Sequence, residues 1–91
     1  MYLEKSVEQY LRKQVIARGG MCIKLDSEAG LPDRLVIWKG GRNFYVELKR
    51  PEGRLSAIQK EYHERLRKLG QKVFVLWNFD DVNNFVKENL L

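Results

Sequence analysis

Two acidic residues and a lysine stand at positions from which they could act together. Asp33 follows Gly30-Leu31-Pro32, Glu47 comes fourteen positions later, and Leu48 alone separates Glu47 from Lys49. Two carboxylates at one point suit a hard cation such as Mg²⁺, which takes oxygen ligands together with water and phosphate oxygens. A lysine beside them could stabilise negative charge that builds up in a transition state.

A β-hairpin would bring these residues together. Residues 34–38 predict one strand, Lys39-Gly40-Gly41-Arg42 predicts a turn, and residues 43–50 predict an antiparallel partner strand. Asp33 then stands at the entrance to the first strand, across from the strand that carries Glu47. The two-residue repeat of that strand predicts a core face of Phe44, Val46 and Leu48 and a charged face of Tyr45, Glu47 and Lys49.

Further elements should flank the hairpin. Apolar spacing predicts a helix over residues 3–18, a strand over 21–25, a second helix over 56–69 and a buried strand over 72–77. Ser56 and Gln59 form a capping-box pattern, and Asp80 is the expected cap of a last helix to about residue 89. The order α-β-β-β-α-β-α predicts an α/β fold, a single mixed sheet flanked by helices, in one domain over residues 1–91.

Composition narrows the class of protein. The 91 residues are 44% hydrophobic and 32% charged, as in soluble globular domains. Cys22 and His63 are the only cysteine and histidine, which excludes an internal disulfide and a zinc cluster. The chain shows neither an export signal nor an apolar run of membrane-spanning length, so we expect a cytoplasmic protein without a membrane partner. A net charge of +5 favours a polyanionic partner such as nucleic acid.

Together these motifs resemble a known family. Pro32-Asp33 followed by Glu47-Leu48-Lys49 is similar to the signature of the PD-(D/E)xK nucleases. The fuller pattern resembles the virus-type replication-repair nuclease (VRR-NUC) family and consists of Glu8, Gly30–Asp33, Glu47–Arg50 and Ser56-x-x-Gln59. The resemblance spans nearly the whole chain. It implies a restriction-endonuclease-like core and a Mg²⁺-dependent DNA endonuclease, with Mn²⁺ able to substitute, whose products carry 5′-phosphate and 3′-hydroxyl ends.

The resemblance also agrees with a role for each residue. Asp33 and Glu47 would hold the metal, and the main-chain carbonyl of Leu48 is implied as a third ligand. The ion would lower the pKa of a bound water, which Lys49 would orient while stabilising the charge of the transition state. The implied catalytic set is completed by Glu8, which could reach the metal directly or through water, and by Gln59.

Each of these residues also has an ordinary structural interpretation. Glu47 and Lys49 could be a solvent-facing strand pair, and Asp33 could be a turn residue after proline. Glu8 could be a solvated helix charge, and Gln59 could serve only the capping box. The first three occur together in the right topological places, which favours the functional interpretation for them.

Several other side chains have expected places. Arg50 and Arg54 precede a helix N-terminus, which favours anions, and with Lys60 they are the candidates for phosphate contacts. His63 is expected to face solvent or a helix edge, without a catalytic role. The large aromatic residues expected in the core or an interface are Trp38, Trp77 and Phe79.

We therefore expect a structure-selective endonuclease that acts as a two-fold homodimer on branched DNA such as Holliday junctions. A short chain gains burial by pairing, and one chain offers one metal centre where a four-way junction needs two opposed nicks. Standalone members of the family are implied to work as paired subunits. The alternatives are a non-catalytic nucleic-acid-binding module of the same fold and a structural or interaction protein. The presence of Asp33, Glu47 and Lys49 argues against both.

Overall fold

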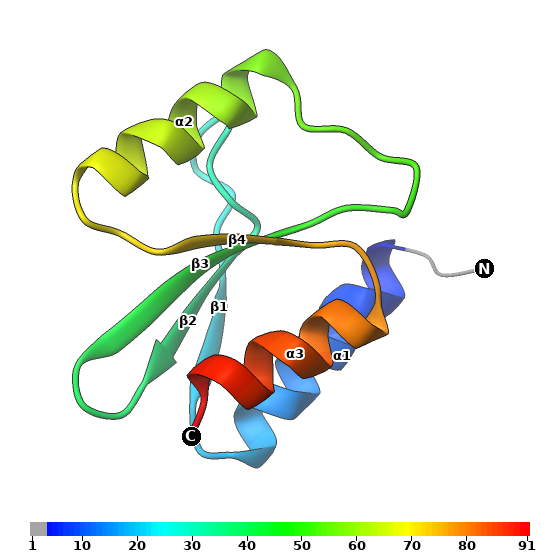
Figure 1. Cartoon of the computed structure of the whole chain (residues 1–91), viewed down its shortest axis with the longest axis vertical. Helices are drawn as coiled ribbons and strands as arrows, with labels where there is room; N and C mark the ends of the chain where they lie inside the picture. The colour runs from blue at the N-terminus through cyan, green and yellow to red at the C-terminus, as the bar shows by residue number, and fades with distance from the viewer. Residues whose placement is uncertain (1–3) are drawn as a thin grey trace.

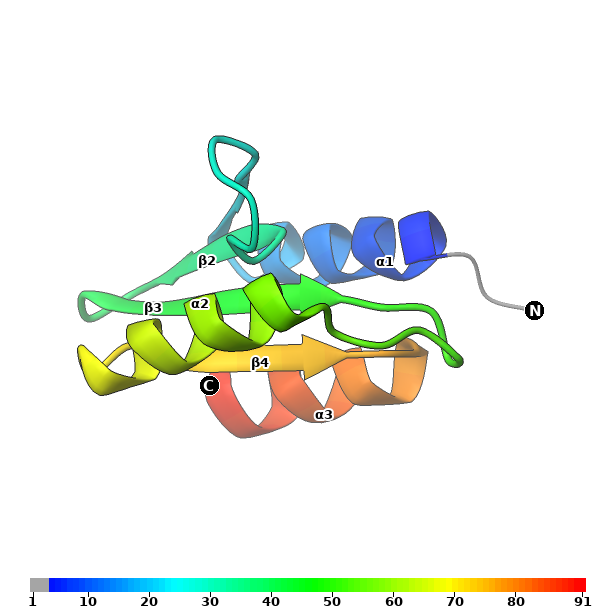
Figure 2. The same ribbon diagram turned by 90° about the horizontal axis from the view of Figure 1, so that it is seen from above.

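Three helices and four strands make up residues 4–91, the part of the chain that the computed structural model describes. The elements follow the predicted order and are α1 (Glu4–Ala17), β1 (Met21–Lys24), β2 (Arg34–Trp38), β3 (Arg42–Leu48), α2 (Ala57–Lys68), β4 (Val73–Leu76) and α3 (Phe79–Asn89). Helices α1 and α3 lie on one face of the sheet and α2 lies on the other (Figures 1 and 2). Within the described residues no helix is both long and apolar enough to cross a membrane.

The four strands form one mixed sheet in the order β1-β2-β3-β4. β1 pairs antiparallel with β2, β2 pairs antiparallel with β3, and β3 pairs parallel with β4. Lys39, Gly40 and Gly41 connect the paired residues Trp38 and Arg42, and both glycines have positive φ angles, 76° and 72°, which glycine adopts without steric cost. Arg34 pairs with Val46 in the β2–β3 register, so the next step along each strand sets Asp33 opposite Glu47.

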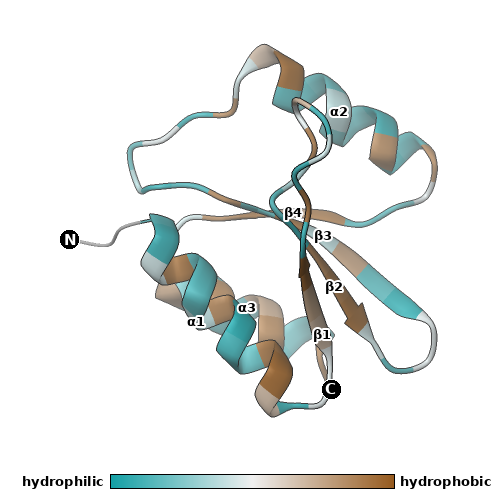
Figure 3. Cartoon of the chain, turned by 180° about the vertical axis from the view of Figure 1, so that it is seen from behind, coloured by the Kyte–Doolittle hydropathy of each residue, from teal (hydrophilic) through white to brown (hydrophobic). Residues whose placement is uncertain are grey.

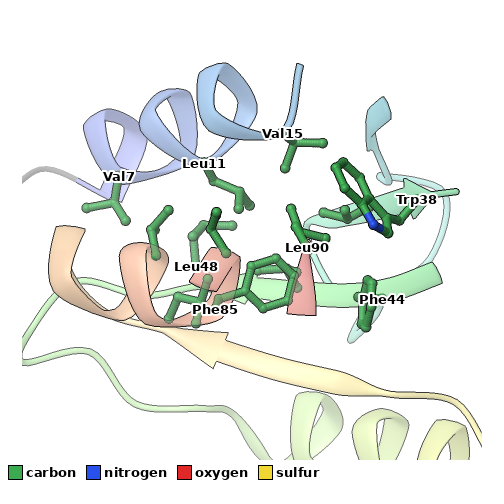
Figure 4. Packing of buried hydrophobic residues seen from close by; sticks show 13 residues of the cluster. Val7, Leu11, Val15, Trp38, Phe44, Leu48, Phe85 and Leu90 are labelled. Carbon is green, nitrogen blue, oxygen red and sulfur yellow. The ribbon is translucent and has the colours of Figure 1, made fainter. Parts of the chain in front are cut away.

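The main core lies between the sheet and the helix pair α1 and α3. Val7, Leu11 and Val15 recur one turn apart on α1 and are buried, which explains why this stripe forms the inner face of the helix. Figure 4 shows these side chains against residues of β2, β3 and α3. Phe44 of β3 and Phe85 of α3 meet edge to face with ring centroids 5.6 Å apart.

Helix α2 packs on the sheet in a different way. Its only buried residue is His63, whereas Ile58 is 57% exposed and Leu69, its C-cap, is 76% exposed. Figure 3 shows hydrophobic segments at both ends of α2 and along β1 and β2. The apolar spacing of α2 therefore does not mark the side that faces the sheet.

The element bounds differ from the predicted ones mainly at the ends. Strand β3 covers Arg42–Leu48 and ends before Lys49 and Arg50. The prediction that Asp80 caps the last helix is wrong, because α3 begins at Phe79 and Asn78 is its N-cap. The Asn78 side chain accepts a hydrogen bond from the Asp81 amide at 2.7 Å, which satisfies a free N–H of the first turn.

Candidate active site

Asp33 is held between two strands at the entrance to β2. Its carboxylate oxygen Oδ2 accepts a hydrogen bond from the Leu48 amide at 2.8 Å, and its main-chain carbonyl accepts one from the Leu25 amide at 2.9 Å. Pro32, immediately before it, is buried. These contacts bring the Asp33 carboxylate to the end of β3, next to Glu47.

Glu47 is buried rather than solvent-facing. Only 2% of the residue is exposed, because α2 covers this side of the sheet. The alternative interpretation of Glu47 as a member of a solvent-facing strand pair is therefore wrong. The Gln59 amide nitrogen donates a hydrogen bond to Oε2 of Glu47 at 3.2 Å.

Gln59 takes part in two structures at once. Its backbone amide donates to the Ser56 hydroxyl at 3.1 Å, and its side-chain oxygen accepts from the Ser56 amide at 2.9 Å, which completes the predicted capping box. Its amide nitrogen is left free to reach Glu47. The two interpretations of Gln59 are thus compatible, since the capping box orients the amide that binds Glu47.

The fold disfavours a negative charge on Glu47. Burial raises the pKa of this carboxyl, and the charge of Asp33 and a hydrogen bond shared with Asp33 raise it further, to about 8. Lys49 acts in the opposite direction and lowers this pKa. With a pKa of about 8, Glu47 favours its protonated form at neutral pH while Asp33 is its neighbour. A divalent cation can take the place of that proton, because it stabilises the negative charge of both carboxylates.

His63 lies against Glu47, contrary to the prediction that it faces solvent or a helix edge. It is 1% exposed, and its Nε2 atom is 3.6 Å from Oε1 of Glu47, which is beyond a normal hydrogen bond. Burial lowers the pKa of the His63 ring, and Arg67 lowers it further. The prediction failed because α2 turns its Gln59 and His63 side toward Glu47, while Ile58 and the C-cap Leu69 remain exposed.

The donor atoms present fit a divalent cation. Asp33 and Glu47 supply carboxylate oxygens, and Oε1 of Glu47 is buried without a hydrogen-bond partner among residues 4–91. The N–H and C=O of one strand residue point to the same side, so the Leu48 carbonyl lies on the side of its amide, which bonds Asp33. In the described chain no group of three or more His, Cys, Asp and Glu residues forms a metal cluster, so such a site relies on these two carboxylates, a main-chain oxygen, water and substrate.

Comparison with known proteins decides the family. No family model matches the chain. A protein of Acyrthosiphon pisum secondary endosymbiont phage 1, described as "Putative nuclease p44", is 39% identical over 75 residues, which make up 80% of this chain and 81% of that protein. A solved structure described as a VRR_NUC domain has a TM-score of 0.87 and 35% identity, covering 94% of this chain and 96% of its own. The chain belongs to the VRR_NUC family.

In this VRR_NUC domain Glu8 binds an arginine beside the site. Its carboxylate is 2.7 Å from Nε of Arg34, and Arg34 also donates to the Cys22 carbonyl at 3.2 Å. Arg34 is largely buried, so the Glu8 pair neutralises a cation that follows Asp33 directly in the chain. The negative charge of Glu4, also on α1, raises the pKa of Glu47.

The predicted phosphate-binding residues of the VRR_NUC domain lie beyond β3. Arg50 and Arg54 are exposed in the connection between β3 and α2, and Lys60 is exposed near the start of α2. Among the aromatic residues, Trp38 is buried in the core, as predicted. Phe79 packs against the core, and the Trp77 ring nitrogen donates to the Gly53 carbonyl at 3.5 Å.

Sequence reasoning missed the place of His63 in this VRR_NUC site. The signal that could have found it is its position four residues after Gln59, since residues four apart share one face of a helix. A helix that directs Gln59 toward Glu47 must direct His63 there as well.

Proposed function

We propose that this VRR_NUC domain is a Mg²⁺-dependent nuclease that hydrolyses DNA phosphodiester bonds with Asp33, Glu47 and Lys49. The observation that carries the proposal is the register of β2 and β3, which sets Asp33 opposite a buried Glu47. The description of the phage relative as a nuclease supports the same class of reaction. The net charge of +5 supports a polyanionic substrate.

Asp33, Glu47 and the Leu48 carbonyl are the residues that would hold the cation. When bound, Mg²⁺ supplies a Lewis acid for a phosphate oxygen and activates water for attack. The chain contributes the geometry, since the Leu48 amide fixes one carboxylate and the Gln59 amide fixes the other. Mn²⁺ prefers the same oxygen ligands and should substitute.

Lys49 is the group proposed to act on the reacting atoms. Lys49 comes directly after the last residue of β3. Its main-chain amide donates a hydrogen bond to the Leu76 carbonyl at 3.0 Å, so the pairing with β4 continues one residue further. Its positive charge lowers the pKa of Glu47, which supports a role for the ammonium group beside the carboxylates. From there Lys49 would orient the attacking water and stabilise the negative charge that develops on the phosphate.

The test measures cleavage and binding of labelled DNA with one preparation of each variant. Glu47→Ala and Asp33→Ala should abolish Mg²⁺-dependent cleavage and retain DNA binding, because each removes a metal ligand and a negative charge. Glu64→Gln is the matched control, since the Glu64 side chain is 68% exposed and pairs only with Lys68 within the described residues. Wild-type cleavage by Glu47→Ala would falsify the assignment, and DNA binding by the wild type without any cleavage would favour the non-catalytic module.

Lys49→Met separates the two roles within the site. We expect cleavage to slow by roughly 100-fold or more, while the rise in melting temperature caused by Mg²⁺ stays as in the wild type. The reason is that Lys49 acts on water and the transition state rather than on the ion. Loss of the Mg²⁺ effect in Lys49→Met would show that this division of roles is wrong.

We further propose that two copies form a two-fold dimer that cuts branched DNA such as a Holliday junction. Large apolar side chains are exposed around α2 and on β1, where Met21 is 57% exposed and Ile23 is 37% exposed. Cys22 packs against the core, so Met21 and Ile23 point to the sheet face on which α2 lies. Exposed apolar residues of this kind on one side of a small domain support self-association.

A further inference from the structure

His63 is an unusual choice for the one buried residue of α2. Ile58 and Leu69 remain mostly exposed, while His63 is 1% exposed. Burial of an imidazole removes less apolar surface from water than burial of a nearby aliphatic side chain would. It also costs free energy, because the polar ring nitrogens lose their hydration. Such a residue needs a compensating partner, and the group that it contacts is Glu47.

Three polar atoms at this contact are left without partners. In the structure of residues 4–91, Oε1 of Glu47 and both ring nitrogens of His63 are buried and make no hydrogen bond. Nε2 of His63 is the atom that faces Oε1 of Glu47, at 3.6 Å. A shift of about 0.5 Å would bring these two atoms to a normal N–H···O distance.

Together with Gln59, His63 completes a pair of donors on one helix face. Gln59 donates to Oε2 of Glu47 at 3.2 Å, and His63 is aimed at Oε1. Each carboxylate oxygen can accept two hydrogen bonds or ligand contacts, so both keep a lone pair for a cation on the Asp33 side.

We infer that His63 is a positioning residue that donates from Nε2 to Oε1 of Glu47 and, with Gln59, sets the orientation in which Glu47 binds the cation. The inference rests on the proposed function, since it concerns the same metal site. Hydrogen-bond partners of metal ligands orient them, and their loss weakens metal binding by about tenfold to a hundredfold.

The experiment measures melting temperature against the concentration of Mg²⁺, and separately of Mn²⁺, for the full chain without DNA. His63→Leu removes the donor and should weaken the affinity for either ion by about tenfold to a hundredfold. Its metal-free melting temperature should not fall, because Nε2 of His63 lies 3.6 Å from Oε1 of Glu47, too far to stabilise the fold until the two atoms move closer. Glu64→Gln, on the exposed side of α2, should match the wild type in both measurements.

Two further variants keep the test decisive. His63→Gln places an amide N–H near the position of Nε2 and should restore most of the metal affinity. His63→Asn is polar but too short to reach Oε1, so it should behave like His63→Leu even if the latter folds poorly.

The outcomes separate this inference from the proposed function. A wild type that gains no stability from either ion would overturn both. If the ions raise the melting temperatures of the wild type, His63→Leu and His63→Asn to the same extent, the role of His63 is overturned and the proposed function stands. A lower metal-free melting temperature in all three variants, with unchanged metal affinity, would show that His63 serves packing only.

Discussion

At the scale of single residues, the site depends on a carboxyl group whose charge the fold opposes. Glu47 is 2% exposed and faces Asp33, and burial together with that neighbour raises its pKa to about 8. Lys49 offsets only part of this effect. A cation between the two carboxylates would reverse the balance, because it favours the ionised form of both.

This pKa predicts how stability without metal depends on pH. The unfolded chain releases the Glu47 proton near 4.5 and the folded chain holds it until about 8, so folding is favoured more at low pH. The stabilising contribution is complete below pH 4.5 and is lost as pH rises to about 8. Chemical denaturation of the wild type and of Glu47→Gln at pH 5 to 9 should show this loss in the wild type alone.

Mg²⁺ should change that pH profile in the opposite sense. Since the cation binds the ionised carboxylates, its stabilising effect on the wild type should grow between pH 6 and pH 9. An equal Mg²⁺ effect at both pH values, or a pH profile of Glu47→Gln identical to that of the wild type, would contradict the assigned pKa.

At the scale of elements, the order of strands and helices follows from the sequence more readily than the orientation of α2. Alternating and helical apolar spacing predicts β2 over its observed residues, Arg34–Trp38, and the stripe that buries α1. The same reasoning fails for α2, because Ile58 and Leu69 are exposed and His63 is buried. The contact of α2 with a buried Glu47 is a tertiary effect that periodicity does not contain.

The loop between β1 and β2 holds α2 in this orientation and also carries Asp33. Gly30 has a φ of 87°, and a Cβ atom there would lie 2.6 Å from Cγ2 and 2.9 Å from the main-chain oxygen of Ile58. Glu28 of the same loop accepts a hydrogen bond from the Tyr62 hydroxyl at 2.5 Å. The loop therefore packs directly on the helix that positions Gln59.

Gly30→Ala should disturb the site through this packing. Gly19 provides the matched control, since its φ is 89° and a Cβ atom there would meet nothing within 4 Å. Both alanine variants incur the backbone cost of a positive φ, and Gly30→Ala alone also pushes the loop from α2. We expect Gly30→Ala to lose more than about 1 kcal/mol of unfolding free energy and to bind Mg²⁺ more weakly than Gly19→Ala. Thermal unfolding with and without Mg²⁺ measures both, and equal results for the two variants would refute the packing argument.

At the scale of the whole molecule, one chain offers one site and an apolar surface on the same side of the sheet. The site lies between α2 and β3, and the exposed Leu69 stands at the end of α2. A second copy that covers this surface would bring two sites into one assembly related by a two-fold axis. That geometry suits two nicks in opposed strands of a four-way junction.

The dimer can be tested with two leucines of nearly equal exposure. Leu69 is 76% exposed and Leu91 is 78% exposed, so neither Leu69→Lys nor Leu91→Lys removes a core residue. Light scattering should give about twice the chain mass of 10.8 kDa for the wild type and for Leu91→Lys, and a monomer for Leu69→Lys.

The same three proteins should differ on a labelled four-way junction in the presence of Mg²⁺. The wild type and Leu91→Lys should give paired nicks on opposite strands, whereas monomeric Leu69→Lys should give slow, unpaired nicks because each copy carries one site. The Mg²⁺ effect on melting temperature should persist in Leu69→Lys, since Asp33 and Glu47 are unchanged. A wild type that is monomeric at micromolar concentration and cuts linear duplex as readily as junctions would refute the dimer and the substrate preference, while the assignment of a nuclease site would stand.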